Sequence, residues 1–220
     1  YTFINDSDWL VVMLLSVVAA IMTGSEFSLG TVRLLLVRGP GRINLWLSKA
    51  LLLLIFAAAI SVVDVLLGFV LGTIIDAVTG HQNAWSFGET ALGALQLIGA
   101  GTLSFWTYAL LALLAATFFR SPIAGIGVAL GYRVAEIVAT PLLILALQGT
   151  DLIHLLGQLN YFLIGNNMDS LFRYAAPVGW ASTPSLFVIN GPQALIYMLV
   201  VATLCLGLAL FNMQSRDVTS

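Results

Sequence analysis

Five apolar segments, each long enough to cross a lipid bilayer, constrain this chain more than any other feature of its sequence. A membrane-spanning helix needs about 20 mostly apolar residues, because only a closed ladder of backbone hydrogen bonds is stable without water. Segments of this kind occupy residues 9–24, 50–75, 91–119, 123–148 and 193–213. The sequence therefore predicts an all-α fold, a polytopic transmembrane helix bundle that forms a single domain over residues 1–220.

The amino-acid composition supports a membrane protein. Of the 220 residues, 60% are hydrophobic and only 8% are charged, whereas a soluble domain carries about 25% charged residues. So few charges could not cover a water-facing surface, so membrane lipid must surround most of the chain. The net charge of −2 argues against a nucleic-acid partner, which would require a basic surface to neutralise phosphates.

The basic residues predict the orientation in the membrane. Six of the eight basic residues lie in three places, which hold Arg33, Arg38, Arg42 and Lys49, then Arg120, and finally Arg216, while the opposite side has only Arg173. With five crossings these places fall on one side, which the positive-inside rule assigns to the cytoplasm. We expect a multi-pass plasma-membrane protein (the inner membrane of a bacterium), with the N-terminus outside and the C-terminus in the cytoplasm.

The chain lacks the motifs of several enzyme classes. A phosphate-binding P-loop requires Gly-Lys-Ser/Thr, but the only lysine, Lys49, lies between Ser48 and Ala50. His81 and His154 are isolated from other metal-ligand residue types at suitable spacing. We therefore expect no enzyme activity, no metal and no cofactor on this chain.

The connection after the first apolar segment, residues 25–48, contains a predicted helix over residues 26–37 that ends at Gly39-Pro40-Gly41. Its pattern is an acidic residue, Gly-Thr, a basic residue, a Leu pair, a proline, and a downstream Arg and Lys. These are Glu26, Gly30, Thr31, Arg33, Leu34, Leu35, Pro40, Arg42 and Lys49. The cluster resembles the first cytoplasmic connection of type-2 ABC exporter permeases.

The resemblance extends to the topology of the whole chain and implies a function. Such permeases have six spans and work as a pair with two separate ATPase subunits, on which ATP and Mg would bind. The connection would then couple this chain to the ATPase, and a second permease copy would complete the substrate pathway. Because only five spans are visible and the chain opens at Tyr1, we expect the first span to be missing. Arg38 and Arg42 could instead only set the topology or contact lipid headgroups.

The outer connection, residues 150–192, alternates short apolar pieces with Gly, Asn and Pro. These pieces are too short to cross a membrane. We expect them to form interfacial or re-entrant helices before the last span.

Three charges lie within the apolar segments: Asp64, Arg133 and Glu136. Each costs at least about 2.5 kcal/mol at the centre of a membrane helix when unpaired, so each should face protein or water. Arg133 and Glu136 are three residues apart and share one helix face. We expect Arg133 and Glu136 to form a structural ion pair, with each other or with Asp64. The alternative is that these charges bind a substrate headgroup or relay protons.

The segment that carries Arg133 and Glu136 also has small residues at four-residue spacing, namely Gly127, Gly131, Ala135 and Ala139. Such a stripe favours close contact between membrane helices. It lies nearly opposite the two charges, which predicts protein or water on both faces of this helix.

Two other functions remain open. An ion- or proton-coupled secondary transporter would use Asp64, Arg133 and Glu136 and would need no ATPase. A non-transporting membrane scaffold would need none of the buried charges.

Overall fold

The computed structural model describes residues 2–29, 41–79, 87–147, 149–150, 152–175 and 189–215. The regular elements in these ranges are all helices: α1 (Thr2–Ser28), α3 (Arg42–Thr79), α4 (Phe87–Phe119), α5 (Pro122–Leu147), α6 (Leu152–Asn160), α7 (Ile164–Ala175) and α8 (Gly191–Ser215). The all-α prediction is confirmed. The two short helices, α6 and α7, lie in the predicted outer connection.

Five of these helices are long and apolar enough to cross a membrane. Their candidate spans are Asp8–Phe27, Ile43–Ile74, Ala91–Phe119, Pro122–Leu147 and Gly191–Met213. The protein is therefore a multi-pass helical membrane protein, as predicted. The first two helices extend further than the apolar segments indicated, since α1 includes Glu26 and α3 already includes Lys49. The connection between them is correspondingly shorter than the predicted residues 25–48.

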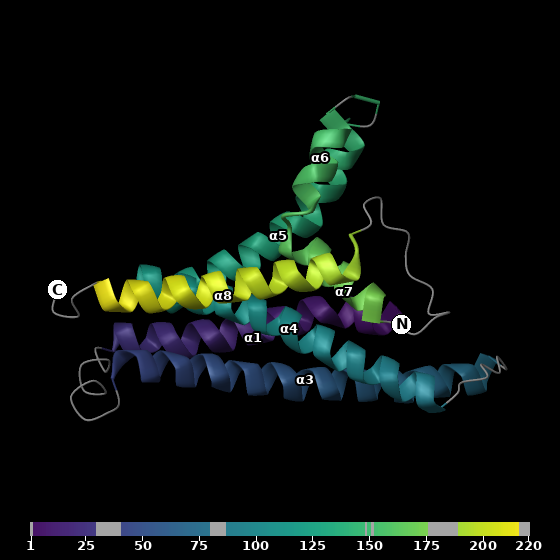
Figure 1. The fold of residues 1–220 in the computed structure, drawn as a ribbon, viewed down its shortest axis with the longest axis horizontal. Helices are drawn as coiled ribbons and strands as arrows, with labels where there is room; N and C mark the ends of the chain where they lie inside the picture. The colour runs from purple at the N-terminus through teal and green to yellow at the C-terminus, as the bar shows by residue number, and fades with distance from the viewer. Residues whose placement is uncertain are drawn as a thin grey trace.

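Helix α4 is the centre of the bundle. It packs against α1, α3, α5, α7 and α8, and 61% of its candidate span is buried (Figure 1). The side chains of Phe105, Tyr108, Leu110 and Leu113 are almost completely buried. The tyrosine among them therefore brings a polar hydroxyl group into the core of the bundle.

Small residues bring α1, α4 and α5 together. A Cβ atom placed on Gly125 would lie 2.8 Å from the Ala20 Cβ, the Ala112 carbonyl oxygen and the Ala116 Cβ, which is closer than such atoms can approach. Gly125 thus allows three helices to meet at one point, as small residues commonly do in membrane proteins.

The predicted stripe of small residues on α5 makes no such contact with the other residues that the structure describes. Gly127, Gly131, Ala135 and Ala139 are all exposed, and the two glycines have open space where a Cβ would lie. Helix α5 instead turns the face that carries Glu136 inward, because an ionised carboxylate is far costlier to expose to lipid than a glycine. Only 11% of its candidate span is buried by the described residues of this chain, so the expectation of protein or water on both faces of α5 stays a prediction.

A tight turn connects α4 to α5. The Ser121 amide donates to the Ala116 carbonyl at 3.2 Å, and Arg120 between them has a positive φ of 52°. This is a Schellman ending, in which glycine is the usual residue at the left-handed position. Ser121 and Pro122 then start α5, as an N-cap and a first-turn proline do.

Figure 1 shows how the remaining helices are arranged. One side of the bundle, which we call the basic side, holds the end of α1, the start of α3, the α4–α5 turn and the end of α8; it lies at the left of the figure. Toward the opposite side, α5 diverges from the bundle, and α6 packs against α5 there. Helix α7 then returns to pack against α4 and α8.

Candidate functional site

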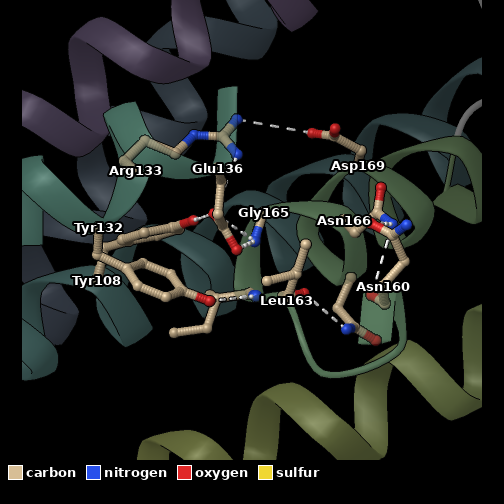
Figure 2. A network of polar contacts seen from close by, with 11 residues as sticks. Tyr108, Tyr132, Arg133, Glu136, Asn160, Leu163, Gly165, Asn166 and Asp169 are labelled. Atoms are coloured by element: carbon tan, nitrogen blue, oxygen red, sulfur yellow. Dashed lines mark hydrogen bonds and ion pairs between the residues drawn. The ribbon is translucent and has the colours of Figure 1, made fainter. Parts of the chain in front are cut away.

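A network of polar side chains surrounds Glu136, in the middle of α5 (Figure 2). The Tyr108 hydroxyl of α4 donates to Glu136 Oε2 at 2.8 Å. The Gly165 amide of α7 donates to both carboxylate oxygens at 3.0 Å. One buried carboxylate therefore joins three helices that are separated in the sequence.

The Glu136 carboxylate caps the N-terminus of α7. The first amides of a helix have no partner within the helix, and its dipole places partial positive charge there. In α7 the Gly165 amide donates to Glu136, and the Ile164 amide donates to the Tyr132 hydroxyl at 3.1 Å. Side chains of α5 thus replace the N-cap that α7 would otherwise take from its own preceding residues.

Gly165 is required by this close approach. A Cβ atom at this position would overlap the Arg133 guanidinium and the Glu136 carboxylate. A larger residue here would displace the ends of these two side chains and disturb their contacts with α7.

Arg133 connects the carboxylate to a second acid. Its Nη1 lies 3.5 Å from Glu136 Oε2, and its Nη2 lies 3.8 Å from Asp169 Oδ1, one turn further along α7. The guanidinium also lies over the Tyr108 ring, 5.9 Å from its centroid, a favourable cation–π arrangement. Partial burial raises the pKa of the Asp169 carboxyl, and the charge of Arg133 opposes this shift.

The predicted pair of Arg133 and Glu136 is therefore confirmed, with an additional partner. That partner is Asp169 on α7. Asp64, the acid that the sequence suggested, is buried on α3.

Asparagines stabilise the turn between α6 and α7. The Asn166 amide group donates to the Asn160 side-chain oxygen at 3.1 Å, while that of Asn167 donates to the backbone carbonyls of Tyr161 and Leu163. The Tyr197 hydroxyl of α8 donates to the Phe162 carbonyl at 2.5 Å. The turn is thus bound both to itself and to the bundle.

These contacts anchor α7 to α4 and α5. Both oxygens of Glu136 accept protein hydrogen bonds, and Arg133 faces two acids. Within the part of the chain that the structure describes, no group of three or more His, Cys, Asp or Glu side chains could hold a metal ion. The site can fix, or release, the position of α7 relative to α4 and α5.

A second charged site joins α1 to α3 on the basic side. Lys49 Nζ lies 2.5 Å from Glu26 Oε2 and 3.4 Å from the Met22 carbonyl oxygen. The same ammonium lies 5.6 Å from the centroid of the Trp46 ring. Only 9% of the Lys49 side chain is exposed, against 22% for Glu26. This pair explains why both helices continue past residues that a hydropathy reading assigns to the connection.

The other residues predicted to couple to an ATPase belong to the same connection. Arg42 begins α3. Gly30, Thr31, Arg33, Leu34, Leu35 and Pro40 lie outside the described residues, as does most of the helix expected over residues 26–37.

Sequence reasoning missed four members of the network: Tyr108, Tyr132, Gly165 and Asp169. One signal was available, because Tyr132 directly precedes Arg133 in an otherwise apolar segment. The other three lie on different helices from Glu136, and no local pattern connects them to it.

A comparison with known protein families identifies the family of this chain. A family model described as a protein of unknown function (DUF2705) matches residues 2–219. The chain belongs to this family. No curated protein matches it.

Proposed function

We propose that this chain is the membrane-spanning permease subunit of an ATP-driven exporter of the type-2 ABC kind. It works as a dimer, forms the substrate pathway, and is driven by separate ATPase subunits. The observation that carries this proposal is the ion pair between Glu26 and Lys49, which are the first and last residues of the pattern that resembles the coupling connection of such permeases.

The pair supplies a physical reason for coupling. Glu26 and Lys49 are 23 residues apart, at the end of α1 and near the start of α3, so they close the base of the connection between these helices. A force on this connection would move α1 and α3 together rather than separate them. Both helices pack against α4, so the movement would reach the centre of the bundle.

The network around Glu136 would carry the movement to the opposite side. Tyr108 of α4 is bound to Glu136 of α5, which in turn holds the N-terminus of α7. A shift of α4 would therefore change the position of α7. In this proposal α7 belongs to the exit side of the pathway, and coupling passes through packed helices with two arrangements.

The contacts of the buried charges weigh against the secondary transporter. A proton- or ion-binding carboxylate needs an accessible oxygen, but those of Glu136 accept hydrogen bonds from Tyr108 and Gly165. A passive scaffold would not require an ion pair as well buried as that of Lys49 with Glu26.

Purification of the tagged chain from its native membranes in mild detergent tests the proposal. We expect a complex of two copies of this chain with two P-loop ATPase chains, measured by native mass spectrometry, and ATP hydrolysis by the complex. The matched control is the same preparation from cells without the tag. A homogeneous, transport-competent preparation of this chain without any ATPase would refute the proposal.

A further inference from the structure

An apolar groove opens on the side of the bundle between α4, α5 and α8. Its volume is about 580 Å³, within the range of about 300–1,000 Å³ typical of small-molecule sites. Eight of its nine lining residues are apolar and the ninth is Asn212. Its walls include Leu111, Leu114 and Phe118 of α4, Val128 of α5, and Leu208 and Phe211 of α8.

The groove lies at membrane depth, near the basic side. Its lining residues all belong to candidate membrane spans. The last part of α4 and the last part of α8 supply most of them. The section of α4 from Leu111 to Phe119 rises by about 12 Å at 1.5 Å per residue. The groove therefore faces one leaflet, and a water-soluble ligand would have to cross lipid to reach it.

The turn at Arg120 and Ser121 lies at the basic-side end of the groove. Arg120 directly follows Phe119, which lines the groove, and connects the two helices α4 and α5 that form its walls. Lipid phosphates carry negative charge at the membrane surface, and basic residues beside membrane helices attract them. The hydrocarbon walls of the groove thus end at a turn that carries a basic residue, on the side nearer the headgroups.

We propose that this groove binds one acyl chain of a phospholipid from the leaflet on the basic side, with the lipid phosphate toward Arg120. The charge distribution favours a lipid over a second copy of the chain. The apolar walls match hydrocarbon along their length, and the end beside Arg120 matches an anionic headgroup. The inference does not depend on the proposed transport function, because it concerns lipid bound to the outer surface of the bundle.

Photo-cross-linking in liposomes tests this site. The purified protein is reconstituted with a phosphatidylglycerol that carries a diazirine in one acyl chain, and the labelled residues are mapped by peptide mass spectrometry. We expect the exposed groove residues Phe118, Phe119, Leu208 and Phe211 to be labelled about fivefold more than comparably exposed apolar positions such as Leu195, a ratio that corresponds to about 1 kcal/mol of preferential binding. Equal labelling of all exposed apolar positions would mean ordinary bilayer contact and would overturn the proposal.

Two variants fill the groove and two matched controls do not. Val128→Trp and Leu208→Trp place an indole in the groove, and we expect each to abolish the preferential labelling. Val134→Trp and Leu204→Trp, on the same helices, change exposed residues that do not line it, and labelling should persist. Should a groove variant fail to fold, the labelling pattern of the unmodified protein still decides the question.

A disulfide assay examines the competing occupant. Leu208→Cys in a Cys205→Ala background is oxidised in liposomes. A covalent dimer formed through position 208 would show that a second copy covers the groove and would overturn the lipid assignment. A monomer that retains the preferential labelling supports it.

Discussion

Replacement of Glu136 tests whether one carboxylate holds α7 to the bundle. Glu136→Leu removes the acceptor of the Tyr108 hydroxyl and of the Gly165 amide and leaves Arg133 with Asp169 as its acidic neighbour. Glu136→Gln keeps one acceptor oxygen in nearly the same shape, but it removes the charge and replaces the other oxygen with an NH2 group that cannot accept a hydrogen bond. The two variants therefore differ in whether any acceptor remains for Tyr108 and Gly165.

The structure sets the expected magnitudes. Hydrogen bonds to a charged group contribute about 1.5–3 kcal/mol each, but side-chain bonds between membrane helices contribute less, at most about 1.7 kcal/mol. Loss of two such bonds should lower the free energy of unfolding by about 2–3 kcal/mol. At about 2–4 °C per kcal/mol for a chain of this size, Glu136→Leu should lower Tm by about 4–12 °C. Glu136→Gln, which loses about 1 kcal/mol of charge assistance, should lower Tm by about 2–4 °C.

The chain provides its own reporter for the measurement. It has a single cysteine, Cys205, which is buried, so a thiol-reactive fluorophore in detergent follows unfolding through this residue. Val138→Leu, on the exposed face of α5, is the matched control and should leave Tm within about 1 °C, as surface substitutions usually do. A Glu136→Leu variant that melts within about 2 °C of the unmodified protein would refute the anchoring role. Equal losses for Leu and Gln would show that the one amide oxygen that Gln retains contributes no measurable stability.

Two further predictions use the same assay. Reversal of one charge in the second site, by Glu26→Lys or Lys49→Glu, places like charges where the ions lie 2.5 Å apart and should lower the free energy of unfolding by about 1–3 kcal/mol. The double exchange should recover most of this loss in a double-mutant cycle. A double variant no more stable than the sum of the two single losses predicts would contradict the pairing. Arg120→Gly relieves a left-handed conformation that costs about 1–2 kcal/mol for other residues, so it should raise Tm by about 2–8 °C, whereas Arg120→Ala should give no gain. Equal effects of the two substitutions would contradict this.

The sequence by itself determined the class of protein and its spans. Long apolar segments specify membrane helices locally, since each helix satisfies its own backbone in lipid. The pairing of Arg133 with Glu136 is local in the same sense, because three residues along a helix bring two side chains to one face. The sequence also placed short helices between residues 150 and 192, where α6 and α7 occur.

Only the tertiary structure decided which face of α5 is inward and what meets it there. The sequence offered two faces, one with small residues and one with charges, and each had a physical reason to be covered. In the fold the charged face packs inward, and Tyr108 and Gly165, 28 and 29 residues away from Glu136, complete its hydrogen bonds. Such contacts depend on how separate helices rotate and cross, which is a property of the whole bundle and of no single segment, so the anchor of α7 could not be read from the chain alone.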